Sequence, residues 1–118
     1  MTDDMFDSFH AHIYFSPGEQ AQRAARLLEN IQAQLGDRVQ VVRWHDKPVG
    51  PHPRGSYQLH VDAAHSSVVL DWLMRHRDGL TVFMHGNSGD DLADHTDHVV
   101  WLGESEALNL SMFRKRPA

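Results

Sequence analysis

Histidine dominates the chemistry that this sequence makes available. Ten of the 118 residues are histidine, several times the usual share, and none is cysteine. A neutral imidazole binds transition metals and titrates near neutral pH, so an excess of histidine indicates metal binding or acid–base chemistry. Without thiols, disulfides, thiolate zinc sites and iron–sulfur clusters are excluded. Any metal must therefore be held by nitrogen and oxygen ligands.

Four of the histidines fall on segments that the sequence predicts to be strands. Residues 9–15 and 56–61 alternate between apolar and polar side chains, and the run 80–85 ends on a histidine. A period of two is typical of a strand with one face against a core. If the apolar side chains cover that core, the others share the opposite face of the sheet. Four imidazoles then lie together, those of His10, His12, His60 and His85.

A further histidine, His52, is enclosed in the loop Gly50-Pro51-His52-Pro53. The ring of Pro51 restricts its own φ, and Pro53 favours an extended conformation for His52. The loop is therefore expected to be rigid, which suits a residue that must be aimed. We expect it to enter the third strand at the end of the sheet where the first strand begins.

The predicted topology brings His12, His52 and His85 near one another from three separate segments. Three neutral imidazoles can bind a divalent first-row metal and leave positions open for water, substrate and oxygen. For any one of them alone, a surface or hydrogen-bonding role stays open, because His-X-His by itself is a weak motif. The convergence of the three is what favours a metal site.

The elements that must position these residues follow the order βαββαβ. Ser16-Pro17-Gly18-Glu19 resembles a capping box and precedes a helical pattern that ends at Gly36, and residues 64–77 predict a second helix. Residues 39–44 predict the second strand and residues 97–102 a fifth. The expected fold class is α+β: a ferredoxin-like sandwich with an extra C-terminal strand and both helices on one sheet face. In this fold the first strand lies between the third and the fourth. The other face is left for a ligand or a partner.

Length and composition indicate one domain, residues 1–118, with residues 1–7 and 112–118 as flexible tails. No apolar run approaches the roughly 20 residues that span a bilayer. The acidic N-terminus lacks the features of a secretory signal, so we expect a cytoplasmic protein. The net charge of −5 argues against nucleic acid as a partner.

The remaining motifs exclude several kinds of enzyme. The sequence contains no Gly-rich phosphate loop, no Gly-X-Ser-X-Gly elbow and no His-Glu-X-X-His helix, so nucleotide-dependent, serine-hydrolase and zincin chemistry have no support. Four aspartates between residues 90 and 97 lack the EF-hand register. His95 and His98 follow a polar loop and could overhang the histidine face as acid–base groups, or lie on a solvated loop.

Four segments together resemble the DOPA 4,5-dioxygenase family, and the resemblance spans nearly the whole chain. They are His12-Ile13-Tyr14-Phe15, Gly50-Pro51-His52-Pro53, the strand that ends at His85, and His95-Thr96 followed by Trp101-Leu102-Gly103-Glu104. The resemblance implies a ferredoxin-like homodimer that opens a catechol ring, of DOPA or another small aromatic diol, beside its two hydroxyls with O₂ and non-haem Fe(II). Zn could stand in place of Fe(II).

The resemblance also implies roles for individual residues. His12, His52, His85 and His95 match family positions: the first three are expected to bind the metal, and His95, or else His10, to move the catechol proton. Arg54 is expected to pair with a substrate carboxylate, and Tyr14 and His60 to line the substrate site. Iron dioxygenases often add a carboxylate ligand, for which Glu104 is the candidate.

Two other functions remain open at this point. One is a non-enzymatic dimeric metal-binding or interaction module, in which a second copy closes the exposed sheet face. The other is a zinc-dependent hydrolase or isomerase, since three histidines with a bound water also describe a catalytic zinc site.

Overall fold

Five antiparallel strands form one sheet with the first strand at its centre. The computed structural model describes residues 5–114. The strand order is β2-β3-β1-β4-β5, so β1 lies between β3 and β4 as the sequence predicts. The strands are β1 Ser8–Phe15, β2 Gln40–His45, β3 Gly55–Asp62, β4 Val82–Gly86 and β5 Val99–Leu102.

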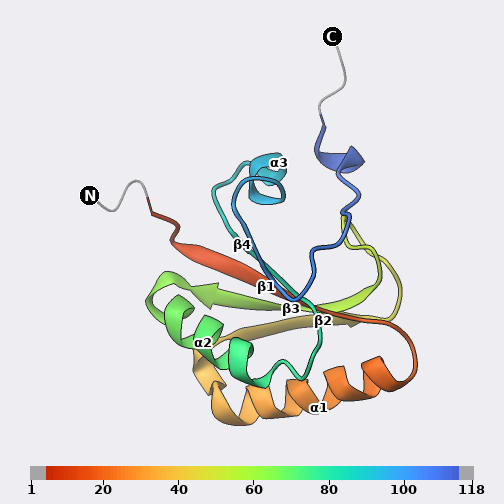
Figure 1. Cartoon of the computed structure of the whole chain (residues 1–118). Coiled ribbons are helices and arrows are strands. Elements are labelled where there is room, and N and C mark those ends of the chain that lie inside the picture. Colours follow the sequence, from red (N-terminus) through yellow and green to blue (C-terminus); the bar gives the residue numbers. More distant parts are fainter. Residues whose placement is uncertain (1–4, 115–118) are drawn as a thin grey trace.

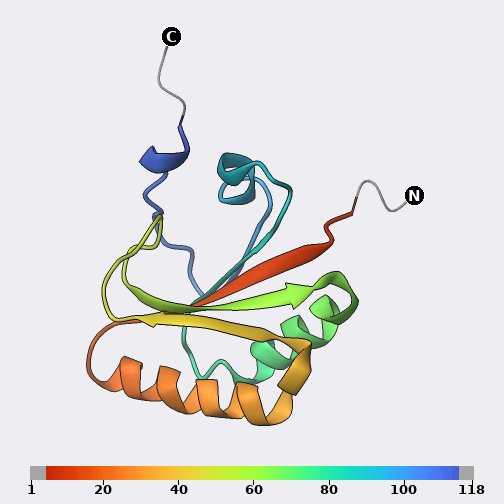
Figure 2. The same ribbon diagram turned by 180° about the vertical axis from the view of Figure 1, so that it is seen from behind.

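Two helices, α1 Glu19–Gln34 and α2 Ser66–His76, cover one face of the sheet in both opposite views (Figures 1 and 2). The predicted α+β fold with both helices on one face is therefore confirmed. Apolar side chains of the strands and helices form a single core, in which burial of each large aliphatic group contributes about 1.5–3 kcal/mol. Its members include Ala11, Ile13, Leu27, Ile31, Leu59, Val61, Val69, Leu73 and Val82.

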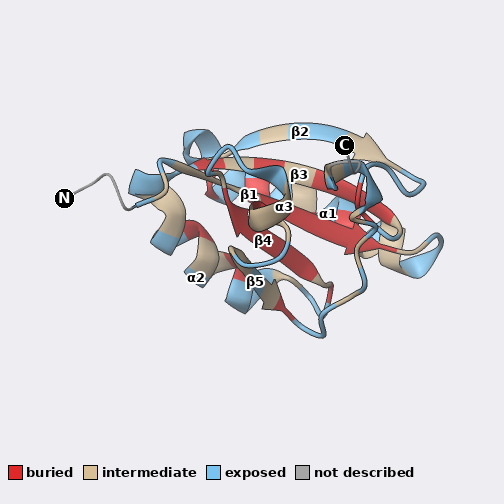
Figure 3. Ribbon diagram, turned by 90° about the horizontal axis from the view of Figure 1, so that it is seen from above, coloured by how far each residue is buried: buried red, intermediate tan, exposed pale blue. Residues whose placement is uncertain are grey.

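The exposed and buried parts of the sheet differ along its width. Buried residues concentrate in β1, β3 and β4, whereas β2 lies at an edge and contains no buried residue (Figure 3). Because antiparallel strands alternate their side chains between two faces, the buried strands must be covered on both sides. The helices account for one side only.

Loops cover the second face of the sheet, and the prediction that this face is left open is wrong. The short helix α3 Asp91–Asp94 and the C-terminal segment with η4 Ser111–Phe113 lie on the side opposite to α1 and α2 (Figure 1). As a result Tyr14 and Phe83, which point to this face, are both 0% exposed. We call the loop 46–54, the segment 87–98 and the segment 103–114 together the roof.

The prediction of a capping box at the start of α1 is also wrong. Gly18 is the N-cap, with φ of +94°, and no side chain caps the helix. This left-handed conformation, which glycine adopts readily, inserts a turn between Ser16 and the helix. The backbone N–H of Ser16 instead donates to Oε1 of Gln20 over 3.0 Å. Ser16 therefore stands two residues upstream of the cap position.

Smaller differences concern element ends and tails. The predicted helix 64–77 begins with a separate turn, η3 Ala63–His65, and β4 and β5 each begin two residues later than predicted. Of the expected tails, Phe6 packs against His98 with ring centroids 5.0 Å apart, and Phe113 packs against His95. Residues 1–4 and 115–118 of these tails lie outside the described residues. No helix within residues 5–114 is both long and apolar enough to cross a membrane.

Candidate metal centre

Strand register brings the predicted histidines together on the roofed face of the sheet. His10 of β1 lies opposite His60 of β3 on one side and opposite His85 of β4 on the other. Residues paired across antiparallel strands project to the same face, and His12, two residues along β1, projects there too. The predicted sharing of one face by these four imidazoles is confirmed.

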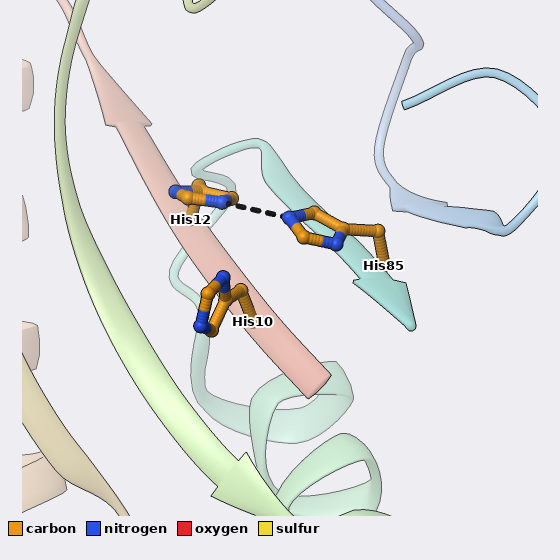
Figure 4. A group of neighbouring side chains, drawn as sticks. All are labelled: His10, His12 and His85. Carbon is orange, nitrogen blue, oxygen red and sulfur yellow. Dashed lines mark hydrogen bonds between the residues drawn. The ribbon is translucent and has the colours of Figure 1, made fainter. Parts of the chain in front are cut away.

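Three of these side chains bring ring nitrogens close enough to hold one ion. One nitrogen each from His10, His12 and His85 lies within 4.8 Å of the others (Figure 4). The Nε2 atoms of His12 and His85 are 3.3 Å apart. Two nitrogen ligands at about 2.0–2.1 Å from one tetrahedral ion lie about 3.3 Å apart, so this pair fits a shared metal.

The tautomer of His85 suits a ligand. Its Nδ1 lies 3.2 Å from the carbonyl oxygen of Gly86, which can only accept a hydrogen bond. Nδ1 must therefore carry the proton, and in the neutral ring Nε2 keeps its lone pair. That lone pair is on the nitrogen that faces His12.

Burial keeps these imidazoles neutral at pH 7. Loss of solvation, followed by the neighbouring imidazoles of His85, His60 and His95, lowers the pKa of His10 to about 4. Burial and the neighbouring His52 and His85 hold the pKa of His12 well below its usual range. Neutral rings offer lone pairs to a metal, so the chemistry of this donor set fits a first-row divalent ion.

The loop that carries His52 enters β3 at the end of the sheet where β1 ends, not where β1 begins. The prediction for this loop is therefore wrong. Because β3 runs antiparallel to β1, its first residue, Gly55, pairs with Phe15 at the end of β1. The loop reaches the histidines by folding back over the sheet, and the His52 ring lies 4.1 Å from that of His12, centroid to centroid. His52 thus adjoins the group of His10, His12 and His85 rather than belonging to it.

Tyr14 fixes the orientation of the His52 ring. Its hydroxyl lies 2.7 Å from Nδ1 of His52, and both side chains are buried. Burial, with a contribution from Glu106 and against that of Arg54, raises the pKa of Tyr14 above its usual value, so the phenol stays neutral. A hydrogen bond to the second ring nitrogen is how proteins commonly orient a histidine ligand. Tyr14 therefore holds the His52 ring in place, and its hydroxyl is occupied by this hydrogen bond.

His95 overhangs the group from the roof. It follows α3, and its ring centroid lies 4.5 Å from that of His85 and 4.6 Å from that of Phe113, on which it stacks. Its Nδ1 lies 2.6 Å from the carbonyl oxygen of Asp91 and so carries the proton. In the neutral ring Nε2 is free to accept another proton.

The buried carboxylate of the roof is Asp94, which the sequence did not single out. Ser88 donates to it from its backbone N–H and its hydroxyl, and Nδ1 of His98 lies 2.8 Å from Oδ1. Burial raises its pKa, but the hydrogen bonds from Ser88 and His98 outweigh burial and hold the pKa below the usual range. The spacing Asp94 to His98 was the available signal. Asp94 organises the segment that carries His95, whereas Glu104, the expected carboxylate ligand, is exposed.

Arg54 is engaged by a second carboxylate that sequence reasoning missed. Its Nε and Nη2 donate to the two oxygens of Glu106 over 2.9 and 2.7 Å. The guanidinium carbon lies 5.9 Å from the centroid of the Tyr14 ring. His60, the other expected substrate-binding residue, is partly exposed, with Nε2 3.5 Å from Oδ1 of Asp62.

The cavities around the group are of unequal size. One of about 90 Å³ adjoins His12 and His52. A larger, mainly apolar one of about 460 Å³ touches His85 and His98 at the edge of the sheet. Ligand sites usually measure about 300–1,000 Å³, so the space beside His12 and His52 is too small for an aromatic ligand with the roof in this position.

Fold and site together define an α+β protein with a histidine-rich candidate metal centre under a roof of loops. A sequence profile of the Dopa 4,5-dioxygenase family matches residues 9–112. The chain belongs to this family.

The chain is also similar to three individual proteins. A crystal structure of a presumed dioxygenase from Nostoc punctiforme matches with a TM-score of 0.84 and 41% identity over 89% of each chain. DOPA 4,5-dioxygenase of Amanita muscaria is 31% identical over 92% of this chain and 50% of its own length. An uncharacterized 21.2 kDa protein of Botryotinia fuckeliana is 28% identical over 92% of this chain and 64% of its own. The chain thus spans between half and two thirds of the length of these two curated relatives.

Proposed function

We propose that this protein is an extradiol ring-cleaving dioxygenase that opens a catechol beside its two hydroxyls with O₂ and Fe(II). The observation that carries the proposal is the 3.3 Å approach of the His12 and His85 Nε2 atoms within a group of neutral imidazoles. The name of the Amanita muscaria relative supports DOPA as the first catechol to test.

The histidines of the sheet would hold the metal. His10, His12 and His85 offer three nitrogens, and a small movement of the loop would let His52 replace or join one of them. Fe(II) held by these residues would supply the Lewis-acid and redox chemistry that a catechol and O₂ need in order to react. Zn²⁺ accepts the same ligands without a redox role.

His95 is the residue best placed to move a proton. Its Nδ1 proton is committed to the Asp91 carbonyl, so Nε2 can take a proton from a catechol hydroxyl and return it later. The stack with Phe113 and the hydrogen bonds of Asp94 hold the segment that presents it. His10 lies within the group of nitrogens and is favoured as a ligand instead.

The roof and the aromatic side chains below it would exclude water from the reacting groups. Phe83 and Trp101 stack with centroids 4.6 Å apart on the same face as His12 and His85. His12 and His85 are each 4% exposed. In a dry site, hydrogen bonds and charges act on the substrate more strongly than they do in water.

Oxygen uptake tests this proposal directly. The full chain is loaded anaerobically with Fe(II), mixed with air-saturated buffer and a panel of catechols that includes DOPA, and compared with His12→Ala. We expect stoichiometric uptake and a ring-opened yellow product, both absent in the variant. No uptake despite bound iron would favour a metal-binding module, and turnover without oxygen that depends on Zn²⁺ would favour a hydrolase or isomerase. The expected homodimer stays a prediction, which a mass measurement in solution tests.

A further inference from the structure

Arg54 presents a two-point carboxylate site next to the histidine group, and the protein fills that site with its own Glu106. The fork of Nε and Nη2 contacts both carboxylate oxygens, which is the geometry in which arginine recognises carboxylates in ligands. Arg54 lies over the ring of Tyr14, and the hydroxyl of Tyr14 contacts His52. One tyrosine side chain therefore links this site to the histidine that adjoins the candidate metal ligands.

The guanidinium is held by contacts that do not involve Glu106. Its Nη1 donates to Oε1 of Gln20 over 2.7 Å and to Oγ of Ser16 over 3.2 Å. Gln20 lies in the first turn of α1, and its side chain also accepts the backbone N–H of Ser16. If Glu106 left, Nη1 would still be held in place, and Nε and Nη2 would stay aimed at a carboxylate.

Glu106 belongs to a part of the roof that contains little regular structure. The segment 103–114, which we call the strap, contains no strand and no helix other than η4, and most of its residues are exposed. The strap makes two further contacts in addition to that of Glu106. The backbone N–H of Asn109 donates to the carbonyl of Pro51 over 2.9 Å, and Phe113 stacks on His95. The strap thus contacts the His52 loop and His95, the two roof segments that carry site histidines.

A ligand that enters the space beside His12 and His52 needs the roof to move, and the Arg54–Glu106 pair is suited to exchange. The cavity beside His12 and His52 measures about 90 Å³. The side chains of Arg54 and Glu106 are 23% and 24% exposed, so water and an incoming carboxylate can reach the pair. Replacing one carboxylate by another on the same fork conserves both hydrogen bonds and the charge pairing, so the exchange costs little.

We propose that Glu106 is an internal stand-in for a substrate carboxylate: an aromatic diol that carries a carboxylate displaces Glu106 from Arg54 and releases the strap as it binds. This inference builds on the proposed function and extends it, because it makes Arg54 the residue that selects carboxylate-bearing substrates. Glu106 then acts as a competitor that uncharged diols do not displace.

The test uses binding by the full chain and needs neither metal, oxygen nor a diol. The probes are 3-phenylpropionate and its uncharged amide, 3-phenylpropanamide, titrated by calorimetry. We expect wild type to bind the acid more tightly than the amide, and Glu106→Gln to bind the acid about tenfold more tightly than wild type, as one lost charge-assisted contact allows, with the amide unchanged. Arg54→Lys, which keeps the charge but loses the fork, should lose most of the preference for the acid.

Glu104→Gln is the matched control, because it removes the same charge from an exposed position on the same segment. An equal gain in acid affinity for Glu104→Gln and Glu106→Gln would show that the gain comes from the change in net charge alone, and would overturn the proposal. So would equal binding of acid and amide by wild type and Glu106→Gln, or no binding of either probe at tens of millimolar.

Hydrogen exchange at the Asn109 amide supplies a second readout. Saturating acid should lower its protection in wild type, and Glu106→Gln should lower it without any ligand, because the strap is then released. Unchanged protection in both cases would identify the pair as a permanent clamp. Preference for the acid in a protein that consumes no oxygen would refute the proposed dioxygenase function alone, and oxygen uptake without that preference would refute this inference alone.

Discussion

The two faces of the sheet are built from the same strands and differ in what covers them. Under the helices, the side chains are apolar and packed by regular elements, as for Ile13 and Leu59, which are fully buried. Under the roof, His12 and His85 are almost as deeply buried, yet they are covered by loops. Helices form a regular and stable cover, whereas loops can move and can leave room for a ligand. Neighbouring residues of β1 therefore face the apolar core and the candidate metal centre in alternation.

The strongest test of this division is His12→Ala, which should remove the function of the roofed face and leave the core intact. One Nε2 of the close pair disappears, so we expect bound metal and oxygen uptake to fall below detection. Metal content after loading and an oxygen electrode measure this. His76→Ala, on the exposed side of α2, is the control and should behave as wild type. Full metal occupancy in His12→Ala would show that the metal binds at another site.

His95→Ala sharpens the comparison by separating catalysis from metal binding within the roofed face. If His95 moves the proton, turnover should fall roughly 10²–10⁴-fold, the usual contribution of a general acid or base, while metal content stays at the wild-type level. Single-turnover kinetics and metal analysis on the same sample measure both. Loss of the metal in this variant would contradict the role and make His95 a ligand.

Ile13→Ala is the corresponding change on the helix-covered face, one residue from His12. Removing this fully buried side chain leaves a cavity, so we expect the free energy of unfolding to drop by about 2–5 kcal/mol. Urea denaturation of the metal-free protein measures it. The surviving folded fraction should still bind metal. If His12→Ala destabilised the metal-free protein as much as Ile13→Ala, the proposed division between the faces would fail.

The pH dependence of stability should arise from the roofed face. The pKa values of His10 and His52 are lowered to about 4 by burial first and by neighbouring imidazoles second. The unfolded chain therefore takes up protons near pH 6.5 that the folded chain excludes, so this contribution to stability is complete above 6.5 and is lost as the pH falls toward 4. Thermal unfolding of the metal-free protein across that interval should show a falling Tm. His10→Gln should flatten the slope, and an unchanged slope would exclude His10 as a source.

Much of the fold follows from local patterns. Alternation along residues 9–15 assigned Ile13 to the core and His12 to the opposite face, because a strand turns successive side chains to opposite sides whatever surrounds it. The order of elements then indicated the position of β1, since few antiparallel arrangements accommodate two crossover helices. Both results needed only the sequence.

The composition of the site depended on contacts distant in the chain. Sequence alone could not show that the His52 loop folds back toward Tyr14, or that His10 rather than His52 completes the group with His12 and His85. Nor could it show that Glu106 occupies Arg54 from 52 residues away. Loop paths and side-chain pairings are set by the assembled tertiary structure, because no local periodicity constrains them.

The sequence by itself determined a histidine-lined sheet face, and tertiary structure decided which imidazoles converge and what covers them. The physical reason is the range of the forces involved: strand alternation is a property of a few adjacent residues, whereas burial, tautomer and the closing of a roof depend on partners brought together by the whole fold.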